Sequence, residues 1–301
     1  MSRTWSGLMV LAVATIPVAS IAGSATGTAP EPVPRTVLAP MMHVPPPPGT
    51  RIGRDIAYGS DPAQTLDLYR PAKATGAPIL IMVHGGGWWR GDKANPVVVD
   101  NKVGHWIPRG YILASVNYRT VPQADPLAQA ADVAEAVAFL QAHARKWGGD
   151  PARVVLMGHS AGAHLVVLLA AAPQVAARAG VKPWLGTIAL DSAAYDVVRI
   201  MRARHLDLYD RAFGTDEQLW RAASPTLRLE TPPAPVLLAC STRRVDACPQ
   251  AEAFAAKVRS LQGRAAIIRL DMTHGDINGL LGTGDEYTGE VDAFLGSLGV
   301  P

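Results

Sequence analysis

Apolar segments of strand length recur along the chain from about residue 51 onward, and segments with helical periodicity lie between them. Apolar runs of this length are typical of strands that are buried on both faces of a sheet. They lie at 78–83, 111–117, 153–157, 186–190, 235–239 and 265–270. A shorter pair at 56–58 and 65–69, separated by a break that contains glycine and proline, predicts two opening strands.

The intervals between these strands carry helical patterns, and the clearest lies at 127–146, just before Gly148 and Gly149. Regular alternation of strand and helix predicts an α/β fold with a mostly parallel central sheet and helices on both faces. The segment 195–231 breaks this alternation. We expect it to form a small cap that shapes a substrate pocket.

The first 50 residues differ in composition from the rest. Arg3 is the only charged side chain before Glu31, and an apolar stretch at 8–21 precedes four small residues, which is the layout of a secretory signal peptide. Cleavage after Ser24 or after Ala25 satisfies the small-residue rule equally well, and an uncleaved membrane anchor is the alternative. Eight prolines between residues 30 and 48 predict an extended linker.

These features divide the chain into a signal peptide at 1–25, a proline-rich linker at 26–50 and a catalytic domain at 51–301. We therefore expect a protein exported to the periplasm or the medium, with no stable membrane anchor after cleavage. The chain has 301 residues, of which 49% are hydrophobic, and a formal net charge of +3 with both signs interspersed. This composition excludes a disordered or collagen-like protein and shows no basic patch for nucleic acid, so a small molecule is the expected partner.

The segment 158–162 reads Gly-His-Ser-Ala-Gly and joins the predicted strand at 153–157 to a helical pattern that begins near Ala161. In this context G-x-S-x-G forms a sharp turn that exposes the serine hydroxyl. The spacing alone is a weak signal, because a serine that caps an ordinary helix is the alternative. The strand before it and the helix after it favour Ser160 as a nucleophile.

The segment 84–87 reads His-Gly-Gly-Gly and directly follows the predicted strand at 78–83. Consecutive glycines allow backbone N–H groups to approach a ligand closely, as the stabilisation of an oxyanion requires. We assign these donors to Gly86 and Gly87, with Ala161 as the third, and interpret His84 as a structural residue of the loop. The residues expected to contact substrate are Trp88, Trp89 and His159, although large aromatic side chains most often pack in a core.

A serine hydroxyl becomes a good nucleophile when a histidine accepts its proton and an acid orients that histidine. On a sheet with this serine turn, serine, acid and histidine follow one another in that order along the chain. His205 and His274 are the histidines that follow Ser160 beyond its own helix. His274 comes directly after the predicted strand at 265–270, whereas His205 lies in the cap segment, so we predict His274 as the base.

The acid has several candidates. Asp246 lies in the loop after the predicted strand at 235–239 and 28 residues before His274, which leaves room for one helix and one strand between them. Asp271 and Asp276 flank His274 too closely to orient it, and Glu252 falls on the next helix. We therefore predict Asp246 as the acid.

Two cysteines, Cys240 and Cys248, bracket Asp246. In an exported protein a disulfide between them would close a small loop and hold Asp246 in place, contributing about 2.5 kcal/mol by loop entropy. Two free buried thiols are the alternative.

Together HGGGWW at 84–89, SVNYR at 115–119, GHSAGAH at 158–164, Asp246 and His274 resemble the α/β-hydrolase superfamily. Within it the chain looks like the carboxylesterases with an HGGG loop, a group that includes hormone-sensitive-lipase-like esterases, feruloyl esterase-like proteins and kynurenine formamidases. The resemblance covers residues 51–301 and implies an acyl-enzyme mechanism without a metal ion or organic cofactor. One departure is that many relatives carry the acid in a Gly-x-x-Asp turn followed by Val-Pro, whereas residues 241–249 read STRRVDACP.

The leading hypothesis is an exported serine carboxylesterase for small or aryl esters. An arylformamidase is the closest alternative, because GHSAGAH and the segment 190–196 also resemble kynurenine formamidases, while the signal peptide argues against amino-acid catabolism. A hydrolase domain that only binds is the third possibility, and the presence of both Ser160 and His274 argues against it.

Overall fold

A computed structural model describes residues 43–301 of the protein. The predicted signal peptide at 1–25, and the predicted linker as far as residue 42, lie outside the described residues. Among the described residues, no helix has the length and apolar character needed to cross a membrane.

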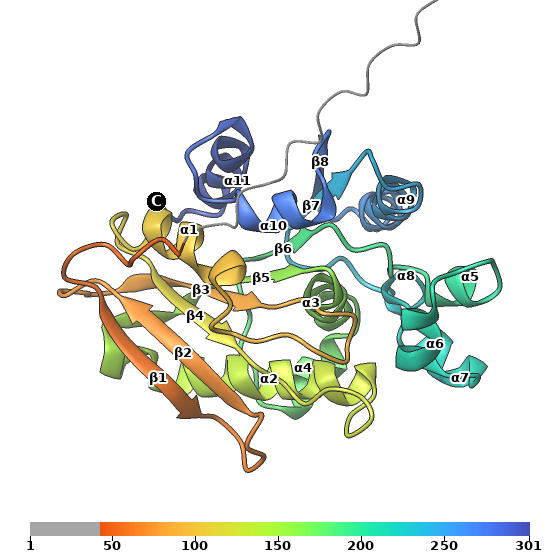
Figure 1. Ribbon diagram of the computed structural model, residues 1–301, viewed down its shortest axis with the longest axis horizontal. Helices are drawn as coiled ribbons and strands as arrows, with labels where there is room; N and C mark the ends of the chain where they lie inside the picture. Colours follow the sequence, from red (N-terminus) through yellow and green to blue (C-terminus); the bar gives the residue numbers. More distant parts are fainter. Residues whose placement is uncertain (1–42) are drawn as a thin grey trace, which may run out of the picture. The chain divides into compact units, whose positions relative to one another are not determined.

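The central feature of the fold is one eight-stranded sheet (Figure 1). Its strands are β1 (Arg51–Ala57), β2 (Thr65–Arg70), β3 (Ala77–Val83), β4 (Ile112–Val116), β5 (Gly149–His159), β6 (Gly186–Leu190), β7 (Val236–Ser241) and β8 (Ala265–Leu270). They lie side by side in the order β1-β2-β4-β3-β5-β6-β7-β8. The pairs β1–β2 and β2–β4 are antiparallel, and every later pair is parallel. The predicted mostly parallel sheet is thus confirmed.

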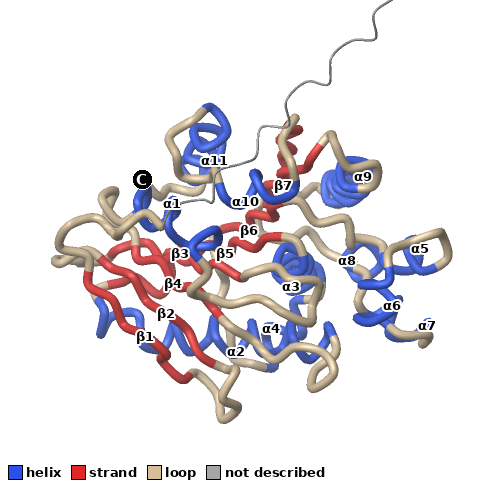
Figure 2. Tube along the Cα trace, viewed as in Figure 1, coloured by secondary structure: helices blue, strands red, loops and turns tan. Residues whose placement is uncertain are grey.

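Helices cover both faces of this sheet, as Figure 2 shows. They are α1 (Pro96–Trp106), α2 (Pro126–His143), α3 (Ala161–Ala171), α4 (Pro173–Arg178), α5 (Val197–Met201), α6 (Asp207–Phe213), α7 (Glu217–Ala222), α8 (Pro225–Arg228), α9 (Ala247–Ser260), α10 (His274–Gly279) and α11 (Glu286–Ser297). The helix predicted at 127–146 corresponds to α2 followed by a 3₁₀ turn at Ala144–Trp147.

Successive side chains of β3 alternate between two apolar cores, as the pleat of a strand requires. Ile79 and Ile81 pack in the core that contains α2, α3 and α9. Leu80 and Met82 pack in the core that contains α1 and α11. Since every residue of β3 is buried, the strand reads as a continuous apolar run in the sequence.

The segment between β6 and β7 interrupts the strand and helix alternation, as the sequence predicts. It contains the four short helices α5 to α8, which lie together beyond the carboxyl ends of β6 and β7 in Figure 1. We call residues 195–231 the cap. The cap packs on α3 and α9, through contacts of α8 with both.

Candidate active site

Ser160 occupies the turn between β5 and α3. Its backbone has φ +55° and ψ −116°, a conformation that a residue with a side chain adopts only at an energetic cost. Its N–H donates to the carbonyl of Leu190 at the end of β6, at 2.9 Å. This turn is the strained strand-to-helix geometry that the motif predicts.

Two glycines make the turn possible. A Cβ on Gly158 would collide with the carbonyl of Gly162, and a Cβ on Gly162 would collide with the carbonyl of Val83 in β3. The helix after the serine therefore approaches the sheet backbone more closely than any side chain permits. The glycine spacing of the motif follows directly from this close approach.

Ser160, His274 and Asp191 form a hydrogen-bonded chain. His274 Nε2 lies 3.0 Å from Ser160 Oγ, and His274 Nδ1 lies 2.6 Å from Asp191 Oδ2. His274 begins α10 directly after β8, whereas Asp191 directly follows β6. This is the arrangement in which a histidine accepts the serine proton while the carboxylate fixes its tautomer.

Asp191 is a fully buried carboxylate with its oxygens satisfied. Ser241 N–H donates to Oδ1 at 2.7 Å, and Arg244 Nη1 donates to Oδ2 at 2.8 Å. Burial alone would raise the pKa of Asp191, but the hydrogen bond from His274 and the nearby Arg244 charge outweigh it and lower the pKa to about 2. The group is held as the anion that a histidine base needs.

The prediction that Asp246 orients His274 is wrong. Asp246 is exposed at the N-cap of α9 and makes no hydrogen bond to His274. The residue of its loop that reaches the histidine is Arg244, whose Nη1 lies 3.2 Å from His274 Nδ1. The Arg244 guanidinium lies beside the buried carboxylate of Asp191. The loop after β6 therefore supplies the acid, and the loop after β7 supplies the positive charge that pairs with it.

The other acids considered from the sequence also have different partners. Asp271 pairs with Arg243, and Glu252 pairs with Arg269 on the surface. Asp276 bonds Thr273 in a capping box at the start of α10. Sequence reasoning misses Asp191, because it considers the segment 190–196 only through its resemblance to kynurenine formamidases. Its signal was an acidic residue at the end of the buried strand next to β5.

The predicted disulfide is present, but it does not hold the acid as we expected. Cys240, in β7, is bonded to Cys248, in the first turn of α9. The bridge closes the loop that carries Arg244. It therefore holds the partner of the acid, and not the acid itself.

The three amides predicted as oxyanion donors lie around Ser160. Gly86 and Gly87 line the same pocket as Ser160, and Ala161 is the first residue of α3. In residues 43–301, none of these three N–H groups donates to a protein acceptor. Gly86 has φ +126° and Gly87 φ +61°, so the loop uses backbone conformations that favour glycine. Their role toward an oxyanion stays a prediction.

His84 is structural, as expected from the sequence. Its ring stacks on Tyr118, with ring centres 4.6 Å apart, and the Tyr118 hydroxyl donates to the His84 carbonyl at 2.9 Å. Burial lowers the pKa of His84, which keeps the ring neutral. These contacts fix the start of the glycine loop.

The two tryptophans that follow the loop differ in environment. Trp88 is buried, and its indole N–H donates to His164 Nδ1 at 3.1 Å. Trp89 is 37% exposed and lines the pocket, and the guanidinium carbons of Arg90 and Arg211 lie 4.8 and 4.3 Å from its ring centre. Both line the pocket, but Trp88 mainly joins the loop to α3.

His159 contacts the predicted base. Its ring lies 4.5 Å from the ring of His274, and its Nε2 donates to the His274 carbonyl at 3.0 Å. Burial, together with the nearby His274, lowers the pKa of His159 to about 3. The His159 ring is therefore neutral and holds His274 in position through the bond to its carbonyl. His159 also lines the pocket.

The pocket around the triad has a volume of about 420 Å³. The cap contributes Leu206, Leu208 and Tyr209 to its wall, which agrees with the expectation that this segment shapes the pocket. His205 is bonded to Asp210 on the surface of the cap and is separate from the triad.

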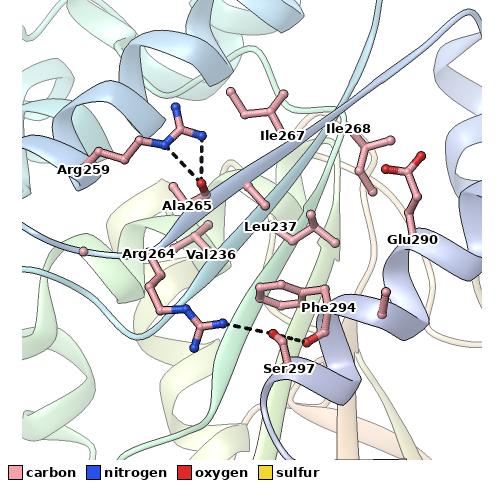
Figure 3. A pocket seen from close by; sticks show the side chains of 13 residues that line it. Val236, Leu237, Arg259, Arg264, Ala265, Ile267, Ile268, Glu290, Phe294 and Ser297 are labelled. Atoms are coloured by element: carbon pink, nitrogen blue, oxygen red, sulfur yellow. Dashed lines mark hydrogen bonds between the residues drawn. The ribbon is translucent and has the colours of Figure 1, made fainter.

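A second cavity, of about 580 Å³, lies between β8 and α11 and contains no triad residue (Figure 3). Its arginines are already bonded to the protein, Arg259 to the Ala265 carbonyl and Arg264 to Ser297. We therefore place the chemistry at Ser160. No cluster of His, Cys, Asp or Glu suited to a metal ion occurs within residues 43–301.

Comparison with known proteins agrees with this architecture. The family described as BD-FAE matches residues 66–194, a range that contains the glycine loop, Ser160 and Asp191. A probable isoprenylcysteine alpha-carbonyl methylesterase of Arabidopsis thaliana is 37% identical over 38% of this chain and 24% of its own length. Esterase LipQ of Mycobacterium tuberculosis is 30% identical over 78% of this chain and 59% of its own. The chain thus spans from a quarter to three-fifths of the length of these curated relatives.

A solved structure, esterase B from Lactobacillus rhamnosis, superposes with a TM-score of 0.71 and 21% identity over 85% of this chain and 88% of its own. At that identity the similarity concerns the fold. Together with the strand order, the turn at Ser160 and the hydrogen-bonded triad, this similarity shows that the chain has the α/β-hydrolase fold.

Proposed function

We propose that the protein is a serine carboxylesterase that hydrolyses small or aryl esters through an acyl-enzyme. The observation that carries the proposal is the chain from Ser160 through His274 to a buried, ionised Asp191. The names of the relatives, which include esterases and a carboxylic ester hydrolase, support the same reaction.

In the first half-reaction, Ser160 Oγ attacks the ester carbonyl carbon while His274 Nε2 accepts the hydroxyl proton. The carbonyl oxygen becomes an oxyanion, which the N–H groups of Gly86, Gly87 and Ala161 stabilise; each such donor is worth about 10²- to 10³-fold in rate. The C–O bond of the ester then breaks, and the departing alcohol takes the proton from His274. The acyl group remains on Ser160.

In the second half-reaction, water attacks the acyl carbon and gives its proton to His274. The carboxylic acid leaves, and Ser160 recovers its proton. Asp191 stays ionised throughout and stabilises the imidazolium that forms in both steps, as its lowered pKa requires.

We also propose that the protein is exported. The charge at Arg3, the apolar stretch and the small residues that follow support this, as does the disulfide between Cys240 and Cys248, which is favoured in oxidising compartments. Expression of the full chain with mass measurement of the periplasmic or secreted product tests it. Loss of about 24 or 25 residues is expected, whereas full-length protein retained in the cytosol would contradict export.

The reaction is tested with 4-nitrophenyl esters of graded acyl length and with N-formylkynurenine, each with and without a serine-directed phosphonate. Phosphonate-sensitive release of nitrophenol with little formamide cleavage is the expected result. Preferential hydrolysis of N-formylkynurenine would replace the proposal by an arylformamidase. Labelling of the Ser160→Ala variant by the phosphonate would contradict Ser160 as the nucleophile.

A further inference from the structure

The pocket beside Ser160 is rich in arginine. Arg90 and Arg244 line it, and the charge of Asp191, the one carboxylate in its lining, is already engaged by His274 and Arg244. Arg211 extends this positive rim, because its guanidinium lies 4.3 Å above the Trp89 ring. A ligand that enters the pocket meets more uncompensated positive than negative charge.

A neighbouring pocket of about 490 Å³ shares Leu206, Tyr209 and Arg244 with the catalytic pocket. Its lining adds Arg199 and Arg204, and its carboxylate is the exposed Asp246. The two pockets therefore meet at Arg244. Its side chain is 29% exposed and lines both pockets.

Arg244 uses only part of its hydrogen-bonding capacity within the protein. Nη1 donates to both the carbonyl and the carboxylate of Asp191, at 2.7 and 2.8 Å. Among residues 43–301, no acceptor bonds its Nε or Nη2. An arginine has five N–H donors in a fixed plane and binds a carboxylate with two parallel hydrogen bonds. The bond to Asp191 holds the guanidinium in place, which lowers the entropy cost of binding a ligand.

We propose that the site prefers esters that carry a second, free carboxylate, and that Arg244 binds this carboxylate through Nε and Nη2. The inference rests on the proposed ester hydrolysis and specifies its substrate class. The apolar wall formed by Leu206, Leu208 and Tyr209 suits the carbon chain or ring between the ester and the charge. Half esters of dicarboxylic acids and acyl esters of hydroxybenzoic acids have this form.

The test compares charged and neutral esters of matched size. The acyl half is probed by 4-nitrophenyl hydrogen adipate against 4-nitrophenyl hexanoate, and the alcohol half by 4-acetoxybenzoate against 4-acetoxybenzamide. For each pair, the ratio of kcat/KM is measured in the wild type, in Arg244→Gln and in Arg243→Gln. Arg243 is the matched control, because it precedes Arg244 in the same loop but bonds Asp271 on the surface.

In at least one pair, Arg244→Gln should lower the charged-to-neutral ratio about tenfold relative to Arg243→Gln, as expected for loss of a charge-assisted bidentate bond. The pair that responds identifies which half of the ester carries the carboxylate. Arg244→Lys should give a charged-to-neutral ratio between those of the wild type and Arg244→Gln, because lysine keeps the positive charge but lacks the planar guanidinium that forms two parallel bonds. Using a ratio removes any effect of the substitution on the triad itself, which both esters share.

Unchanged ratios in both pairs, with neutral esters still hydrolysed and Ser160 still labelled by phosphonate, would overturn the inference and leave the proposed function intact. Absence of any hydrolysis and of labelling would instead remove the proposed function. Should Arg244→Gln fail to fold, inhibition of the wild type decides the matter. Adipate should compete with a neutral ester while adipamide does not, and equal inhibition by both would contradict carboxylate binding.

Discussion

The loops after β6 and β7 start from similar buried parallel strands, yet they contribute opposite charges to the site. The loop after β6 places Asp191 against His274, with φ +53° at the aspartate and complete burial of its carboxylate. The loop after β7 is closed by a disulfide and places Arg244 against that carboxylate. Strand β6 lies beside β5, which ends at the serine turn, whereas β7 is one strand farther away. The base follows β8, and β7 lies between β6 and β8, so Asp191 reaches His274 across the carboxyl end of β7.

The largest expected effect comes from Asp191. Asp191→Asn keeps the size of the side chain but removes the charge that fixes the tautomer of His274, so kcat should fall about 10⁴-fold. KM should change little, because the group acts on the base and not on bound substrate. Steady-state kinetics with a 4-nitrophenyl ester measures both, and a loss of less than tenfold in kcat would assign the acid elsewhere.

The disulfide should have the next largest effect, on stability. Replacing Cys240 and Cys248 by serine removes a restriction on the unfolded chain, which gains conformational entropy. The free energy of unfolding, measured in urea, should therefore fall by about 2.5 kcal/mol. Activity should also fall, because Arg244 is then held less firmly against Asp191. An equally stable double variant would show that this loop is held in place by its other contacts.

A smaller effect links Asp191 to acid stability. Its folded pKa of about 2 lies below the usual value of 3.8, so the unfolded state binds more protons between those values. This difference stabilises the folded state by about 2 kcal/mol above about pH 5, and the stabilisation is lost as the pH falls toward 2. Urea midpoints at pH 5 and pH 2.5 should therefore differ more in the wild type than in Asp191→Asn; equal differences would contradict the lowered pKa.

Protonation of the buried His164 does not obscure this comparison. Burial lowers the pKa of His164 to about 4, and its ring is bonded to Trp88 and to the Ala223 carbonyl in both proteins. Its acid-linked loss of stability is therefore common to wild type and variant and cancels in the difference.

The smallest effect belongs to Asp246. Since this side chain is exposed and has no bond to His274, Asp246→Asn should leave kcat within about twofold of the wild type. The same ester assay measures it. A fall in kcat of several orders of magnitude would instead show that Asp246, in the loop after β7, is the acid.

The sequence predicted the parts of this molecule that depend on local pattern. The sheet follows from apolar runs such as 78–83, and the serine turn follows from glycines whose spacing reflects close packing of α3 on β3. His274 was predicted because it directly follows the last strand. Each of these inferences uses residues that are near one another in the chain.

The acid could not be chosen in the same way, because two loops each place an aspartate after a buried strand. Which aspartate turns toward His274 depends on the backbone at Asp191 and on the position of Arg244. Both are consequences of tertiary packing between segments more than 50 residues apart. The strand order does not supply the missing information, because β7 neighbours β8, which precedes the base, while β6 neighbours β5, which precedes the serine.

A proton NMR measurement of the hydrogen bond between His274 and Asp191 tests directly whether Asp191 is the acid. An imidazole proton shared with a carboxylate over 2.6 Å resonates far downfield of ordinary amide protons. We predict that this signal is present in the wild type and in Asp246→Asn and absent in Asp191→Asn. A signal that survives in Asp191→Asn and disappears in Asp246→Asn would contradict the assignment of the acid to the loop after β6.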